Sequence, residues 1–151
     1  MHIPLLVATL CQRNVVTVCE DVSIKEAAGL MRKHHVGCLV VVRGEPARPA
    51  GMLTDRDIAI VAVARDFDPQ TLRVADVMTE PAHSIGASAP ALTALQAMRR
   101  HGVRRLPVTG EVGELTGIVA MDDLLGAFAD ELLMFAQALK HERAVEQQVK
   151  V

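Results

Sequence analysis

The sequence contains two copies of one pattern, 67 residues apart. When the chain is shifted by that distance, residues 10–41 align with residues 77–108, and seven aligned positions carry the same amino acid. The motif that follows, residues 51–57, aligns with residues 117–123 at a distance of 66, because one residue is missing from the loop before it. A repeat of this length is longer than most solenoid units. We therefore expect two copies of a small α/β unit that pack against each other, with any binding site in two versions between or just outside them.

Each copy carries the same order of secondary-structure signals. In the first copy, a β-prone stretch over residues 15–18 is followed by an amphipathic helix, and the capping box of Ser23 and Glu26 marks the start of that helix. An apolar strand over residues 38–42 comes next. A third strand then ends at Thr54, where a second helix begins. The second copy repeats this order, so the sequence predicts a β-α-β-β-α unit that occurs twice.

These signals divide the chain into three parts. We expect the first repeat over residues 1–68, with a lead segment over residues 1–9, and the second repeat over residues 69–127. A C-terminal helical extension follows over residues 128–151. The last helix runs into this extension with apolar residues at helical spacing: Leu124, Leu125, Phe128, Leu132, Phe135 and Leu139. This apolar stripe indicates a partner surface, either within the chain or on a second subunit.

Composition narrows the possible classes of function. The net charge is −2, and the only aromatic residues are three phenylalanines, so the chain offers neither a strong attraction to nucleic acid nor a surface on which bases stack. The opening apolar run is short and contains Pro4, which is typical neither of a signal peptide nor of a transmembrane span. Three cysteines without a Cys-x-x-Cys pair fit free thiols in a reducing compartment. We expect a cytoplasmic protein that does not contact membranes.

The sequence shows no pattern of a metal site or of an active site. His34 and His35 are adjacent in a predicted helix, so their side chains point about 100° apart and do not share one metal ion easily. No His-x-x-x-His pair, Gly-x-Ser-x-Gly turn or Walker loop is present. We therefore expect no bound metal and no catalysis.

Taken in order, these motifs resemble a tandem pair of cystathionine-β-synthase (CBS) domains, the Bateman module, in its stand-alone bacterial form. The resemblance covers about residues 10–125 and rests on segments 36–41, 51–58, 76–79, 101–108 and 117–124. It implies two repeats that pack pseudo-symmetrically through their sheets, and a homodimer. It also implies a non-catalytic energy sensor that binds an adenine nucleotide (AMP, ADP or ATP) and passes that state to its oligomer or to a regulated protein partner. S-adenosylmethionine and NAD are secondary ligand candidates.

The central motif of this family is complete in the first copy, as Gly51, Thr54 and Asp57. By resemblance, Asp57 accepts hydrogen bonds from the two ribose hydroxyls, and Thr54 holds the ribose or the phosphate. A carboxylate offers two acceptor oxygens to a diol, and a helix N-terminus attracts phosphate. The same spacing also describes a helix capping box, worth about 1 kcal/mol, and the two roles can coexist. In the second copy Ala120 stands in place of the threonine while Asp123 remains, which predicts two unequal sites.

The resemblance implies further ligand contacts. Arg104 and Arg105 offer guanidinium groups to phosphate oxygens, although a solvated basic face explains each arginine equally well. Arg56, inside the complete motif, is a third ligand candidate. The remaining implied contacts are Thr17 and Ser84 for the adenosine and Val36, Cys38, Val103, Leu106 and Pro107 as apolar walls for the base.

Two other functions stay open at this point. A structural dimerisation module with vestigial pockets is favoured by Ala120, which breaks the second motif. A nucleic-acid binder would use the basic stretch over residues 99–105, against which the net charge and the scarcity of aromatic rings count. Parallel and antiparallel dimers are both compatible with the sequence.

Overall fold

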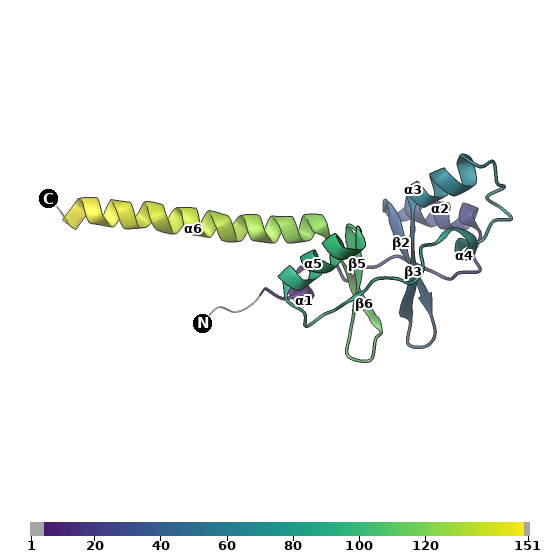
Figure 1. The fold of residues 1–151 in the computed structure, drawn as a ribbon, viewed down its shortest axis with the longest axis horizontal. Coiled ribbons are helices and arrows are strands. Elements are labelled where there is room, and N and C mark those ends of the chain that lie inside the picture. Colours follow the sequence, from purple (N-terminus) through teal and green to yellow (C-terminus); the bar gives the residue numbers. More distant parts are fainter. Residues whose placement is uncertain (1–4, 150–151) are drawn as a thin grey trace.

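A computed structural model describes residues 5–149, and Figure 1 shows its fold. The first four residues of the expected lead segment and the last two of the expected extension lie outside the described residues. Each repeat forms its own three-stranded sheet, so the predicted α/β architecture of two β-α-β-β-α units is confirmed. No helix within residues 5–149 has the length and apolar character needed to cross a membrane.

The first sheet has the order β1-β2-β3, with β1 parallel to β2 and β2 antiparallel to β3. Its elements are β1 (Thr17–Val18), α2 (Ile24–His34), β2 (Cys38–Arg43), β3 (Arg48–Thr54), α3 (Asp55–Asp57) and the π-helical segment η1 (Ile58–Val63). The predicted capping box of α2 is present, because the Ser23 hydroxyl accepts the Glu26 N–H while the Glu26 carboxylate accepts the Ser23 N–H. This box fixes the residue at which the helix begins.

The second sheet has the equivalent order β4-β5-β6. Its elements are β4 (Ile85–Gly86), α5 (Ala91–His101), β5 (Arg105–Thr109), β6 (Leu115–Ala120) and α6 (Met121–Val149). The two repeats differ most after their third strands. The first repeat continues into the short α3 and η1, whereas the second continues into a single helix of 29 residues.

Two short helices pack on the repeat that they do not belong to in sequence. Helix α1 (Val7–Leu10) precedes the first repeat, yet Val7 is fully buried in the core of the second, with Met98 and Leu106. Helix α4 (Val74–Val77) precedes the second repeat, yet it packs in the core of the first. Each core is therefore completed by the segment that leads into the other repeat. The chain divisions at residues 68 and 127 stay predictions about the sequence repeat.

Two backbone bridges join these crossing segments to the third strands. Met52 in β3 exchanges hydrogen bonds of 3.0 and 2.8 Å with Thr79, which follows α4. Ile118 in β6 exchanges two bonds of 2.9 Å with Gln12, which follows α1. The two bridges are equivalent under the sequence repeat. They hold the end of each third strand against the chain that enters the opposite repeat, and this is where the pockets form.

Helix α6 leaves the body of the protein. Leu124 is its one buried residue, and from Leu132 to Val149 all of its residues are exposed. In Figure 1 the helix projects as a single rod beyond α5 and α1. The apolar stripe predicted from the sequence is therefore left uncovered along most of its length within the described structure.

Candidate ligand-binding site

Two pockets lie where the third strands give way to helices. The first-motif pocket, of about 440 Å³, contains Thr54 and Asp57, at the start of α3. The second-motif pocket, of about 280 Å³, contains Ala120 and Asp123, at the start of α6. The larger pocket has a volume typical of small-molecule sites, and the smaller one lies just below that range of roughly 300–1,000 Å³.

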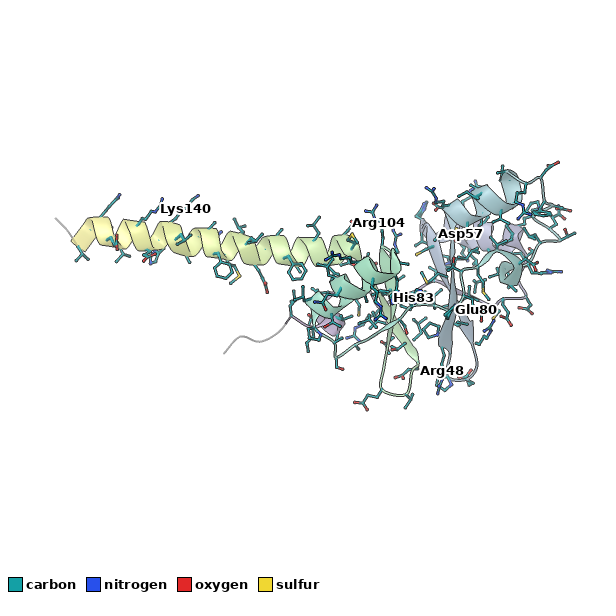
Figure 2. The ribbon with its side chains drawn as sticks, viewed as in Figure 1. Arg48, Asp57, Glu80, His83, Arg104 and Lys140 are labelled. Atoms are coloured by element: carbon teal, nitrogen blue, oxygen red, sulfur yellow. The ribbon has the colours of Figure 1, made fainter. Side chains whose placement is uncertain are left out.

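Each pocket takes its walls from both repeats. Val103, which follows α5 in the second repeat, lines the first-motif pocket, and the equivalent Val36 of the first repeat lines the second-motif pocket. Figure 2 shows Asp57 and Arg104 on opposite repeats across the junction between them. In each repeat, the residues that follow the first helix therefore line the pocket that contains the motif of the opposite repeat.

Thr54 and Asp57 form the capping box predicted as one of their two roles. The Thr54 N–H and hydroxyl both donate to Oδ2 of Asp57, at 2.9 and 2.7 Å, and the Asp57 N–H donates to the Thr54 hydroxyl oxygen at 3.1 Å. All of these bonds to the carboxylate use Oδ2. Oδ1 of Asp57 accepts none of the hydrogen bonds found among residues 5–149, so one carboxylate oxygen stays available to a ligand while the box is intact.

The second motif keeps only half of this arrangement. The Ala120 N–H donates to Oδ2 of Asp123 at 2.8 Å, which still caps the start of α6. Because alanine has no hydroxyl, the reciprocal bond to the Asp123 N–H is absent. The two motifs thus share a carboxylate and differ in one hydroxyl group.

The two pockets differ more strongly in charge. Three arginines line the first-motif pocket: Arg56, Arg104 and Arg105. In the second-motif pocket, the positions equivalent to these three arginines carry Asp122, Gly37 and Cys38. The one arginine of this pocket is Arg105, which lines the first-motif pocket as well. Each pocket also holds two aspartates. The first-motif pocket therefore has a surplus of positive charge, and the second-motif pocket has a surplus of negative charge.

Arg104 keeps its charge available to a ligand. Its guanidinium Nη2 lies 3.8 Å from Oδ1 of Asp122, and the two side chains are 74% and 82% exposed. An exposed ion pair at this distance contributes little, because water screens both charges. A phosphate oxygen could replace this contact at little cost.

Cys38 lines both pockets as a neutral side chain. Burial raises the pKa of the Cys38 thiol above its ordinary value; the Arg105 guanidinium opposes this shift and Asp55 adds to it. The thiol is therefore protonated at neutral pH. It serves as a small wall for both pockets and carries no charge into either.

The structure divides the predicted site residues into three groups. Thr54, Arg56, Asp57, Val103 and Arg104 line the first-motif pocket, Val36, Ala120 and Asp123 line the second, and Cys38 and Arg105 line both. Thr17 and Ser84 are exposed and lie outside both pockets, as do Leu106 and Pro107, which are buried. Because consecutive strand residues point to opposite faces, Leu106 faces the core where Arg105 faces the pockets.

Several lining residues were not predicted from the sequence. Met52 lines the first-motif pocket and Ile118 the second, each two residues before the motif position Thr54 or Ala120. The period of two along a strand would have identified both. His83 and Val16 line the pockets, and each stands directly before a residue predicted to contact the ligand, Ser84 or Thr17.

No group of three or more His, Cys, Asp or Glu side chains gathers at metal-binding geometry within residues 5–149. His83 and His101 do stack, with ring centroids 3.7 Å apart and ring planes 14° apart. This pair lies at the edge of the first-motif pocket, since His83 is one of its walls.

The fold and the paired pockets define a class of protein, an internally duplicated α/β protein in which both repeats contribute to two unequal pockets. The CBS domain family model matches residues 7–63 and again residues 74–130. The chain therefore belongs to the CBS domain family and carries two such domains. The family predicted from the sequence motifs is confirmed.

Among known proteins, the chain is similar to the CBS domain-containing protein YhcV of Bacillus subtilis (strain 168), with 43% identity over 111 residues that cover 74% of this chain and 76% of that protein. It is 37% identical over 111 residues to hypoxic response protein 1 of Mycobacterium tuberculosis, with the same coverage of the two chains. An uncharacterized protein of Methanopyrus kandleri is 33% identical over 119 residues, which are 79% of this chain but only 60% of the length of that protein.

Solved structures share the same fold. The crystal structure of Hypoxic Response Protein I with two coordinated zinc ions aligns at a TM-score of 0.71 and 33% identity, over 80% of this chain and 96% of that chain. CBS domain protein PAE2072 from Pyrobaculum aerophilum, complexed with AMP, aligns at a TM-score of 0.72 and 29% identity, over 79% and 89% of the two chains.

Proposed function

We propose that this protein is a non-catalytic regulatory module that binds an adenine nucleotide in the first-motif pocket and passes that state to its own oligomer or to a protein partner. One observation carries the proposal: a free carboxylate oxygen, Oδ1 of Asp57, and three arginines line the same pocket of about 440 Å³. A nucleotide presents a ribose diol and a phosphate, which require an acceptor and a cation respectively.

Each part of the nucleotide has a suitable partner in this pocket. Oδ1 of Asp57 accepts hydrogen bonds from the ribose hydroxyls. Arg104 and Arg105 bind the phosphate oxygens, with Arg56 at the start of α3 as the third cation. Met52 and Val103 offer apolar surface to the adenine ring. The AMP complex of the similar protein PAE2072 supports an adenosyl ligand for this chain as well.

The proposed role is regulatory because the pocket contains groups that bind and none arranged to react. The Cys38 thiol is held protonated, which makes it a poor nucleophile. The free thiols of Cys11, Cys19 and Cys38 fit action in the cytoplasm, where such thiols stay reduced.

The test is a comparison of thermal unfolding with AMP, ADP, ATP, S-adenosylmethionine, NAD and adenosine. A ligand at 100 times its dissociation constant stabilises the folded state by about 2.7 kcal/mol. We expect at least one of AMP, ADP and ATP to raise the unfolding temperature clearly more than adenosine does, because adenosine lacks the phosphate. If none of the six compounds changes the unfolding temperature, the proposal is wrong.

A second candidate function, a structural dimerisation module, is favoured by the capping box. Thr54 and Asp57 already form hydrogen bonds with each other without a ligand. Helix capping would be their whole role if the pocket stayed empty. The same thermal comparison separates the two candidates, since a scaffold gains nothing from any adenine compound.

A further inference from the structure

The exposed part of α6 carries more apolar surface than one helix in water normally presents. Leu125, Leu132, Phe135 and Leu139 have exposed fractions of 67%, 69%, 69% and 59%. Large apolar patches of this kind on soluble proteins mark interaction sites. Within residues 5–149, α6 packs against α1, α5 and β6, and near its start Leu124 lies in the core of the second repeat with Met121 and Phe128 packed against it. The apolar surface farther along the helix is therefore free to pack against another molecule.

The spacing of these residues indicates the structure of the partner that packs on them. Met121, Leu125, Phe128, Leu132, Phe135 and Leu139 follow one another in steps of four and three residues, which is the seam of a coiled coil. The seam ends at Glu142, where the next apolar residue would stand. Such a seam fits a second helix with a matching seam. Helix α6 of a second copy of this chain carries the same seam, and every chain in solution brings one.

Charge favours an antiparallel arrangement of the two helices. The first eleven residues of α6 contain Asp122, Asp123, Asp130 and Glu131 and no basic residue, whereas the second half balances Lys140 and Arg143 with Glu142 and Glu146. A parallel pair would place the acidic halves side by side, where like charges repel. An antiparallel pair separates the two acidic halves and places each beside the half of the other copy that has no net charge, and it also opposes the two helix dipoles.

One antiparallel register satisfies both the seam and the charges. When Leu132 packs against Phe135 of the second copy, Leu139 of the second copy meets the exposed part of Phe128, which is half-buried against its own core. The same register puts Arg143 opposite Asp122 of the second copy. Asp122 is 82% exposed and available for that contact.

We propose that α6 pairs with α6 of a second copy as an antiparallel coiled coil centred between Leu132 and Phe135. The pairing would form the interface of the oligomer to which the proposed regulatory module passes its nucleotide state. The pairing itself does not depend on nucleotide.

Sedimentation equilibrium of the full chain tests the interface with two matched variants. Leu132→Glu places a charge in the seam, whereas Leu133→Glu places the same charge one residue away and outside it, at a leucine that is also exposed. We expect a dimer for the wild-type chain and for Leu133→Glu, and a dissociation constant raised about 100-fold for Leu132→Glu, which corresponds to about 2.7 kcal/mol. A monomeric wild-type chain, or equal effects of the two variants, would overturn the proposal.

Orientation is tested by one distance between spin labels. A ketone-bearing amino acid at Gln147 takes a nitroxide without changing the native cysteines. At about 1.5 Å per residue, the antiparallel register separates the two labels by about 40 Å, whereas a parallel pair brings them within about 20 Å. The short distance would overturn the antiparallel arrangement. Nucleotide titration of Leu132→Glu keeps the two proposals separate. A variant that is monomeric and still binds nucleotide is consistent with both of them.

Discussion

Cys38 and Arg105 occupy equivalent positions in the two repeats, and each of them lines both pockets. In the strand registers, Cys38 lies opposite Thr54 and Arg105 lies opposite Ala120. The pockets therefore meet at this pair of residues. The two residues differ chemically, because one repeat places a neutral thiol where the other places a permanent positive charge.

We predict that Arg105→Gln weakens the binding of a phosphorylated adenine nucleotide at least about tenfold, which corresponds to about 1.4 kcal/mol. The reason is the loss of a charge-assisted hydrogen bond to phosphate. Calorimetric titration with the nucleotide and with adenosine measures the effect, and adenosine affinity should change much less. An equal loss for both ligands would show that Arg105 shapes the pocket without holding the phosphate.

We predict that Ala120→Thr stabilises the protein without creating a second nucleotide site. The new hydroxyl can accept the Asp123 N–H and complete the capping box of α6, a gain of about 1 kcal/mol in the free energy of unfolding. Arginines equivalent to Arg56 and Arg104 are still missing from this pocket. Urea unfolding measures the gain, and calorimetric stoichiometry counts the sites. A second saturable nucleotide site in this variant would contradict the role assigned to the arginines.

We predict that Gly51→Ala and Gly117→Ala each lower the free energy of unfolding by about 1–3 kcal/mol, because the added methyl group overpacks a backbone crossing. A Cβ at Gly51 would lie 2.9 Å from the Thr79 carbonyl oxygen, and one at Gly117 would lie 2.9 Å from that of Gln12. Gly29→Ala is the matched control. Its Cβ meets no atom within 4 Å, and alanine favours the helix by up to about 1 kcal/mol. Urea unfolding of the three variants should give losses at the first two positions and none at the third.

We predict that His101, which stacks on His83, makes the protein less stable in mild acid. Partial desolvation, together with the positive charges of His83 and Arg100, lowers the pKa of His101 below its ordinary value of about 6.5. As the pH falls through that value, the unfolded chain binds a proton more readily than the folded one, so the free energy of unfolding decreases until the pH lies below the lowered pKa. Above the ordinary value neither state binds the proton, and the contribution vanishes.

Urea unfolding at about pH 7.5 and about pH 5.5 measures this effect against His101→Asn. The variant should lose less stability than the wild-type chain between the two conditions. His83→Asn removes one of the charges that act on His101 and should reduce the loss in part. Identical losses for all three proteins would contradict the prediction.

Local signals in the sequence predicted most of the fold. The repeat and the apolar periodicity gave the order of strands and helices in both halves, and the pair Ser23 and Glu26 gave the start of α2. The pairing of Thr54 with Asp57 was also predicted in its capping role. These features depend on residues close together in the chain. The long α6 was likewise predicted, from apolar residues at helical spacing between Leu124 and Leu139. The π-helical form of η1 had no such signal, since Ile58–Val63 is simply an apolar run at helical spacing in the sequence.

The features that the sequence did not reveal depend on packing between the repeats. Helices α1 and α4 complete opposite cores, and Val36 and Val103 line the pocket of the opposite motif. Both exchanges arise because the crossing segments at Gln12 and Thr79 bind the far third strand, a contact between residues more than 25 positions apart. A pattern read along one repeat carries no information about which repeat its side chains will face.

Calorimetric titration of Asp57→Asn beside Asp123→Asn shows whether the first-motif pocket alone binds nucleotide. Both substitutions act at equivalent carboxylates and keep the size of the side chain. The titrant is whichever of AMP, ADP and ATP stabilises the wild-type chain most. We predict one site per chain in the wild-type protein, affinity lost or reduced at least about tenfold in Asp57→Asn, and nearly unchanged affinity in Asp123→Asn. Full binding by Asp57→Asn, with loss in Asp123→Asn, would instead place the nucleotide in the second-motif pocket.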